Sequence, residues 1–215
     1  PMIHKNRDNV ARSQAAYYKK VIVDGKDLYG YISIGDVSDT GLMMMVNEKG
    51  LAGLADTGGI DENNPTGKGI MNPYILRYIA ENAETCEEAI AILTEMVEKR
   101  WYAGGDIGTH WLFVDRFGTG VRVANNSREV VIFESMQNGI DATKPMIRFL
   151  LEKHNGKVTL NVLNELSRHA TICLPKTISA YSVKIDKDRP DILTRIDISM
   201  GRPSDTVYIP IFMSM

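Results

Sequence analysis

The stretch ISAYSVKIDKDRPDILTRIDIS, residues 178–199, indicates antiparallel β-structure near the end of this chain. Apolar and β-branched residues alternate with other residues in Ile178–Ile185 and again in Ile192–Ser199, which predicts two strands. The segment between them, Asp186–Asp191, is polar and contains a proline, as turns commonly do. A short link of this kind predicts a hairpin, and the two strands of a hairpin run antiparallel.

Six more strands are expected upstream of the hairpin, because short runs of β-branched and apolar residues lie between turn residues. These strands are Lys20–Val23, Leu28–Ile34, Leu42–Val46, Trp111–Val114, Val121–Ala124 and Val130–Phe133. Four helices are expected between and after them. They are Pro73–Asn82, a helix capped by Thr85 with a stripe of Ala89, Ile92, Leu93 and Met96, Pro145–Lys153, and a helix capped by Thr159 with Val162, Leu163 and Leu166.

The order of these elements indicates an α+β fold with largely antiparallel sheets. Strands come in groups, and pairs of helices separate the groups, whereas a parallel sheet would need a crossover helix between each pair of strands. A chain of 215 residues is long enough for one well-buried core. We therefore expect a single domain over residues 1–215.

Glycine-rich stretches at residues 50–53, 58–59, 67–69 and 104–105 suggest a phosphate-binding loop at first sight. None of them has the spacing of a nucleotide-binding motif, so turns and close backbone contacts are the better interpretation. Residues 56–71 are predicted to form a long loop that borders a pocket.

Composition disfavours several classes of function. The net charge of −2 and the pI near 6.1 give no basic field for nucleic acid or an anionic membrane surface. No apolar run reaches membrane-spanning length. Cys86 and Cys173 are too few for a disulfide framework, and neither they nor the histidines have metal-ligand spacing. We expect no metal and no cofactor.

Several segments, taken in order, resemble one family. The polar cluster Lys5–Asp8 by itself fits a solvated turn as well as a site. Other segments agree with a site, however, and together they span nearly the whole chain: Val46–Ala52, Thr85–Ala89, Trp111–Asp115, Ile178–Ala180, Gly201–Pro203 and Tyr208–Pro210. The set resembles the choloylglycine hydrolase and penicillin V acylase families, and within them the acyl-coenzyme A:6-aminopenicillanic acid acyltransferase-like branch of the N-terminal-nucleophile hydrolases.

The resemblance implies a four-layer αββα sandwich of two antiparallel sheets, which agrees with the expected order of strands and helices. It also implies hydrolysis of linear amide C–N bonds, or acyl transfer, by an N-terminal Cys whose own α-amino group is the base. No such Cys precedes Lys5 in this chain, so we expect a truncated first strand and a site without its nucleophile.

Four residues correspond to catalytic positions of the family. The resemblance makes Asp8 the carboxylate that holds the terminal amine, and places Lys5 where the family commonly has an Arg. Arg168 resembles the Arg that orients the site, although an Arg at a helix end on the surface is an alternative. Asn138 is the candidate oxyanion donor, although Gln137–Gly139 also fits an ordinary turn.

Two interpretations of function therefore stay open. The first is an amidohydrolase or acyltransferase whose partner is a small-molecule acyl amide. The second is a catalytically inactive binding or structural protein that keeps the same fold. A free sheet edge left by a truncated first strand would favour a homo-oligomer that covers it.

Overall fold

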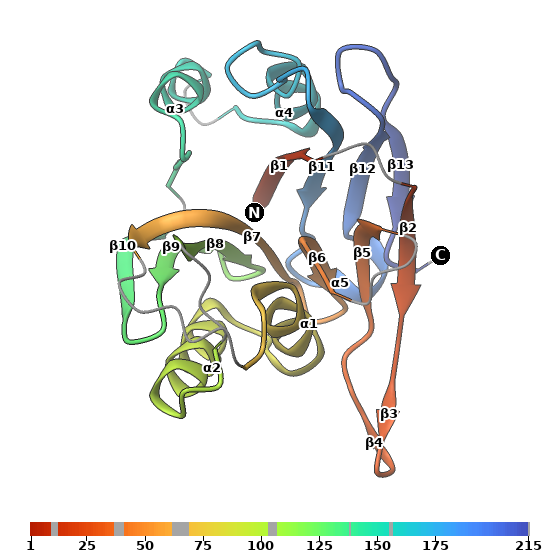
Figure 1. Cartoon of the computed structure of the whole chain (residues 1–215). Coiled ribbons are helices and arrows are strands. Elements are labelled where there is room, and N and C mark those ends of the chain that lie inside the picture. Colours follow the sequence, from red (N-terminus) through yellow and green to blue (C-terminus); the bar gives the residue numbers. More distant parts are fainter. Residues whose placement is uncertain are drawn as a thin grey trace.

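The computed structural model describes residues 1–9, 13–36, 41–61, 69–102, 107–137, 139–154 and 157–214. Two large antiparallel sheets face each other in it (Figure 1). The four-stranded sheet has the order β1 (Met2–Asp8), β11 (Thr177–Lys184), β12 (Arg195–Met200) and β13 (Ile209–Phe212). The seven-stranded sheet has the order β10 (Val130–Gln137), β9 (Thr119–Asn125), β8 (Ile107–Asp115), β7 (Leu51–Asp61), β6 (Met44–Asn47), β5 (Tyr31–Asp36) and β2 (Gln14–Lys19).

Helices cover the outer faces of both sheets. Apolar side chains of α1 (Asn72–Asn82) and α2 (Cys86–Glu98) pack with Trp111 and Phe113 on the outer face of the seven-stranded sheet. On the other side, α4 (Leu160–Leu166) contacts β11, and α3 (Pro145–Glu152) packs against α4 through a small apolar cluster. The layers are therefore helix, sheet, sheet and helix, which confirms the predicted sandwich. No helix in the described ranges is long and apolar enough to cross a bilayer.

The main core between the sheets follows from strand alternation. Side chains at every second position point to the same face of a strand, so Ile32 and Ile34 of β5 meet Tyr181 and Val183 of β11 across the interface. All four side chains are at most 3% exposed. Burial of each such side chain contributes roughly 1.5–3 kcal/mol, which makes this interface a principal source of stability for the sheet pair.

The start of α2 is fixed by side chains on both sides of it. Thr85 Oγ1 accepts a hydrogen bond from the Glu88 backbone N at 3.2 Å, as the sequence predicts. The Glu88 carboxylate accepts from the backbone N of Glu84 rather than from that of Thr85. Asp115, at the end of β8, accepts from the Cys86 backbone N at 3.2 Å and so ties the helix to the sheet.

The Asn47 side chain stabilises the turn from β6 to β7, within the segment 46–52. Its side-chain oxygen accepts from the backbone N of Lys49 and of Leu51, and its amide donates to the carbonyls of Ala80 and Ala83 at the end of α1. Asn47 is fully buried, and these four bonds satisfy its side chain. The Asn47 side chain thus holds the end of α1 against the turn of the sheet.

The predicted strand Lys20–Val23 is wrong. In the structure β2 ends at Lys19, and Ile22–Val23 forms the two-residue strand β3, which pairs with β4 (Lys26–Asp27). Asp24 and Gly25 between them have φ values of 51° and 77°, the conformation of a tight hairpin turn. Asp24 and Gly25 end the apolar run, so Ile22–Val23 belongs to a projecting hairpin (Figure 1). It is not part of the seven-stranded sheet.

The glycine-rich segment after residue 50 was predicted as turn and loop, and this is also wrong for its first part. Residues 51–61 form β7, the central strand of the seven-stranded sheet. A side chain at Gly53 would lie 2.6 Å from the Phe113 ring, so the glycine lets the neighbouring strand pack closely. Residues 62–68 of the predicted loop lie outside the described residues.

Other strands also differ from the prediction. β1 continues through the polar cluster to Asp8, because its backbone pairs with β11 whatever the side chains are. The second strand of the C-terminal hairpin begins at Arg195, since the short helix α5 (Pro190–Leu193) takes up the start of the predicted strand. β2 and β13 were not predicted at all.

Candidate active site

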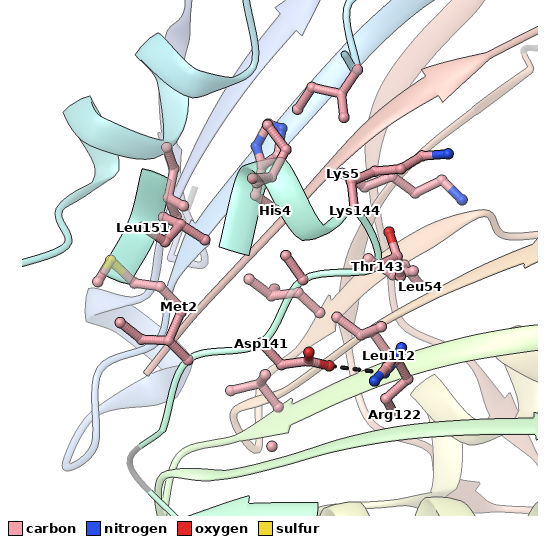
Figure 2. A pocket seen from close by; sticks show the side chains of 18 of the residues that line it. Met2, His4, Lys5, Leu54, Leu112, Arg122, Asp141, Thr143, Lys144 and Leu151 are labelled. Carbon is pink, nitrogen blue, oxygen red and sulfur yellow. Dashed lines mark ion pairs between the residues drawn. The ribbon is translucent and has the colours of Figure 1, made fainter. Parts of the chain in front are cut away.

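A cavity of about 700 Å³ runs along β1 between the seven-stranded sheet and the helices α3 and α4 (Figure 2). Lys5, Asp8, Asp56 and His110 give polar groups to its wall. Leu54 and Leu112 come from the seven-stranded sheet, and the helices supply an apolar wall of Ile147, Leu151, Leu163 and Leu166. The cavity thus has a small cluster of polar side chains beside a large apolar surface, as small-molecule sites commonly do.

Lys5 is held at the polar side of the cavity. Its Nζ donates to the Ala55 backbone carbonyl at 2.6 Å and lies 3.6 Å from Asp56 Oδ2. The Lys5 side chain is 9% exposed and that of Asp56 is 67% exposed, so solvent screens the ion pair. Burial lowers the pKa of Lys5, and the Asp56 carboxylate opposes this shift. The cation is therefore positioned mainly by the Ala55 carbonyl.

Asp8 lies three residues further along the same strand. Its Oδ1 accepts a hydrogen bond of 2.6 Å from Thr177 Oγ1. Thr177 stands opposite Asp8 in the β1–β11 ladder, where the register shifts between Arg7 and Asp8. Asp8 is exposed and lines the cavity. Lys5 and Asp8, both predicted from the sequence, therefore line the same cavity.

His4 and Asn6 form a fixed polar network on the helix side of β1. Asn6 Nδ2 donates to the carbonyls of Ser167 and Ile172, so Asn6 Oδ1 is the acceptor for His4 Nε2 at 2.9 Å. His4 Nδ1 then accepts from Ser182 Oγ at 2.8 Å. Burial lowers the pKa of His4 to about 4, against a weaker opposing effect of the Asn6 hydrogen bond. His4 is thus a neutral structural histidine at neutral pH.

His110 is a second histidine of the cavity wall. It stands opposite Asp56 in the β7–β8 ladder and meets the Phe133 ring edge to face at 6.0 Å. Burial and the Arg122 cation lower the pKa of His110. Its Nε2 is buried, and the described part of the chain offers it no hydrogen-bond partner.

An ion pair closes the cavity on the side of the segment 139–144. Arg122 Nε of β9 lies 3.0 Å from Asp141 Oδ2 (Figure 2). Arg148 of α3 lies 3.6 Å from the other oxygen of Asp141. The Asp141 side chain is 9% exposed, so this pair is better shielded from solvent than that of Lys5 and Asp56. It connects the seven-stranded sheet to the start of α3.

Neither of the two other predicted site residues is among the described residues that line this cavity. Arg168 follows α4, is exposed, and donates to the carbonyls of Asn164 and Thr206 while its guanidinium lies 5.3 Å from the centre of the Tyr208 ring. It does not line the cavity. Asn138 lies outside the described residues. The structure therefore brings together two of the four predicted residues, and their catalytic roles stay predictions.

Asp56 was missed because residues 56–71 were predicted to form a loop. His110 was missed because the histidines were considered only for metal-ligand spacing. Had β7 been recognised, strand alternation would have placed Asp56 on the same face as Leu54. The same rule places His110 on the face of Leu112 and Val114 in β8.

Neither cysteine of the chain reaches the cavity. Cys86 is 2% exposed at the start of α2, and Cys173 is 4% exposed after α4. Burial and the Asp115 carboxylate raise the pKa of the Cys86 thiol. Within the described ranges, no group of three or more His, Cys, Asp or Glu side chains is placed to hold a metal ion.

The fold is similar to that of several solved amidohydrolases. A variant of the conjugated bile acid hydrolase from Clostridium perfringens matches with a TM-score of 0.59 and 13% identity, over 99% of this chain and 88% of that one. Penicillin V acylase from Agrobacterium tumefaciens matches with a TM-score of 0.55 and 15% identity, over 93% and 78% of the two chains. The Caenorhabditis elegans ortholog of N-acylethanolamine-hydrolyzing acid amidase matches with a TM-score of 0.53 and 10% identity, over 88% and 87%.

At these identities the structural similarity shows the fold alone. No curated protein matches the sequence. A family of enzymes does match it over residues 1–140, which include β1 with Lys5 and Asp8 and the strands that carry Asp56, His110 and Arg122. The chain belongs to the acyl-coenzyme A:6-aminopenicillanic acid acyl-transferase family.

Proposed function

We propose that this chain forms the body of a hydrolase, or acyltransferase, that acts on the C–N bond of a small linear acyl amide. The presence of Lys5, Asp8 and Asp56 in the lining of one cavity carries the proposal. Membership of an acyltransferase family supports it, and so does the fold shared with the bile acid hydrolase and the penicillin V acylase. We extend only the reaction class to this chain, because those relatives are named for different substrates.

The proposed chemistry is nucleophilic catalysis by the thiol of an N-terminal cysteine. The thiol attacks the amide carbonyl while the α-amino group of the same residue takes its proton. The amine leaves with a proton as the C–N bond breaks, and water or a second amine then cleaves the thioester. An α-amino group has a pKa of about 7.7–8.0, so a useful share of it is neutral at working pH.

The chain's own residues would position these groups. Asp8 would hold the terminal ammonium, since its carboxylate is already oriented by Thr177. Lys5 would place a positive charge beside the reacting carbonyl, since its Nζ is fixed on the Ala55 carbonyl. Asn138 as oxyanion donor and Arg168 as an orienting cation belong to the same proposal. The thiol itself would come from a residue other than Cys86 and Cys173, which are both buried elsewhere.

The test is an assay of amine release. The protein purified from its natural source is incubated with a panel of acyl amides, and mass spectrometry identifies both the released amine and the N-terminal residue of the protein. We expect turnover by a form that begins with cysteine. Lys5→Ala should lower kcat/KM by about tenfold or more, and Lys153→Ala, an exposed lysine of α3's end, should leave it unchanged. A natural protein without an N-terminal cysteine would contradict the proposal.

A second candidate function is the binding of acyl amides without turnover. The observation that favours it is that neither cysteine of this sequence lies in the cavity wall. Calorimetric binding of an acyl amide with no release of amine would support this candidate. Release of amine would exclude it.

A further inference from the structure

A register shift interrupts the ladder between β1 and β11 beside Asp8. Arg7 stands opposite Ser179, and the next residue of β1, Asp8, stands opposite Thr177. Ile178 is therefore an extra residue on the β11 side, and it has no partner in β12, where the pairing begins at Ser179. One extra residue of this kind is a β-bulge, and bulges commonly redirect a side chain at a functional site.

The bulge creates the hydrogen bond that orients Asp8. In a regular ladder Asp8 would stand opposite Ile178, whose side chain has no hydrogen-bond donor. With the extra residue, Thr177 stands there instead, and its Oγ1 donates to Asp8 Oδ1 at 2.6 Å. Pairing resumes directly afterwards, since the Asn9 backbone N donates to the Lys176 carbonyl at 3.1 Å. The position of the Asp8 carboxylate therefore depends on the bulge.

The carbonyl of the extra residue is held from the other sheet. Gln14 Nε2, at the start of β2, donates to the Ile178 carbonyl at 2.8 Å. The Gln14 side-chain oxygen accepts from Ser179 Oγ at 2.7 Å and from Arg7 at 3.1 Å. An arginine can only donate, so the Gln14 amide must present its oxygen to Arg7 and its nitrogen to Ile178. Gln14 thus connects β1 and β11 at the bulge.

Arg7 and Asp36 fix the position of Gln14. Arg7 donates to Asp36 Oδ1 at 3.1 Å, and Asp36 stands opposite Gln14 in the β2–β5 ladder. Arg7 is 4% exposed and Asp36 is 6% exposed, so neither can exchange its partner for water without cost. A buried network of this kind holds a single arrangement. We call Arg7, Gln14 and Asp36 the bulge clamp, because they connect the bulge to the seven-stranded sheet.

We propose that Gln14 is a positioning residue of the proposed active site, because the bulge clamp fixes the bulge that places Asp8 against Thr177. The consequence for turnover rests on the proposed function, in which Asp8 holds a terminal ammonium. The link from Gln14 to the Asp8 carboxylate does not rest on it, because it follows from the register shift and the hydrogen bonds. A clamp that only joined the two sheets would affect stability and leave Asp8 in place.

The first test follows the carboxyl carbon of Asp8 by NMR in the purified chain. Thr177→Val removes the hydroxyl group that bonds Asp8, so this variant gives the resonance position of the carboxylate without that bond. Gln14→Met keeps the length of the side chain but removes its hydrogen bonds to Ile178, Ser179 and Arg7. We expect Gln14→Met to shift the Asp8 resonance toward its position in Thr177→Val. A resonance that stays at its parent position would overturn the inference.

Asn82→Leu is the matched control for Gln14→Met. The Asn82 amide also donates to a backbone carbonyl, that of Tyr78 at 2.9 Å, but it lies at the end of α1. This variant should leave the Asp8 resonance unchanged. If Gln14→Met fails to fold by circular dichroism, Ser179→Ala decides the question, because it removes one donor to the Gln14 oxygen. Its shift should have the same direction and be smaller, and no shift at all would overturn the inference.

The second test measures turnover by the natural form that begins with cysteine. Gln14→Met should lower kcat about tenfold, because a catalytic group is displaced, and should leave KM within about twofold of the parent value. Adding Gln14→Met to Asp8→Asn should cause no further loss of kcat, since both changes act through the same carboxylate.

The pH profile distinguishes positioning from stability. A carboxylate beside the α-ammonium raises its pKa, so displacement of Asp8 should move the acidic limb of the profile to lower pH. Asp8→Asn should move this limb in the same direction. Lower stability of Gln14→Met with an unchanged pH profile would mean that the clamp only joins the two sheets, and this result would overturn the inference.

The two tests separate this inference from the proposed function. A shift of the Asp8 resonance in Gln14→Met, in a protein that releases no amine from any acyl amide, would support the clamp and count against the proposed function. Release of amine at the parent rate by Gln14→Met, with the Asp8 resonance unmoved, would reject the clamp and leave the proposed function intact.

Discussion

Acidification should destabilise this protein through His4. The ring of His4 is neutral in the fold, because Nε2 donates to Asn6 and Nδ1 accepts from Ser182. Burial lowers the pKa of His4 from 6.5 to about 4. Between these two pH values the unfolded chain binds a proton that the folded chain does not, so stability falls as the pH is lowered. The stability that the neutral His4 ring contributes is fully present above pH 6.5 and is lost by about pH 4.

The size of this effect follows from the shift. A pKa shift of one unit corresponds to about 1.36 kcal/mol. For a fully buried ring, the free energy of unfolding would therefore fall by about 3 kcal/mol over this pH range. His4 also lines the cavity, where water reaches part of the residue. We therefore expect His4 to account for about 1–3 kcal/mol of lost stability between pH 7 and pH 4.

Urea unfolding followed by circular dichroism at pH 7, 6, 5 and 4 measures the effect. His4→Gln removes the titrating group, so the free energy of unfolding should fall less steeply with pH than in the parent protein. His154→Gln is the matched control, because His154 is exposed, and its pH dependence should equal that of the parent. An unchanged slope in His4→Gln, or a pKa near 6.5 for His4 by NMR, would refute the reasoning.

Three further predictions concern stability and reactivity. Asp36→Ala should lower the free energy of unfolding by about 3 kcal/mol, because the buried Arg7 guanidinium, 3.1 Å from the Asp36 carboxylate, loses its ion pair. In urea unfolding, the double variant Arg7→Met with Asp36→Leu should lose less stability than the sum of the two single variants. Gly108→Ala should lower the free energy of unfolding by about 3 kcal/mol, since a Cβ there lies within 2.5 Å of backbone carbonyl oxygens. Gly120→Ala should lower it by less than about 1 kcal/mol, because the atom nearest to the added Cβ is 3.5 Å away. Cys86 should react with iodoacetamide only after unfolding, because it is 2% exposed and burial raises the pKa of its thiol, and rapid labelling of the folded protein in mass spectra would disprove this.

The sequence alone determined the elements whose stability is local. The capping pattern of Thr85 and Glu88 predicts the start of α2, because the bonds that satisfy a helix end lie within one turn. The polar link after Ile185 predicts a hairpin for the same reason, since a short link brings its flanking strands together. These local patterns, with the grouping of strands and helices, were enough to predict two antiparallel sheets between helices.

The tertiary structure alone decided β7 and the site. A glycine-rich segment is a poor strand by propensity, and β7 exists because β6 and β8 pair with both of its edges and because Gly53 makes room for the Phe113 ring. Lys5 meets the carbonyl of Ala55, a residue fifty positions away, so the contact depends on how two sheets pack. Side-chain chemistry is written in the sequence, but which groups share a cavity is set by burial and pairing between segments that lie far apart in the chain.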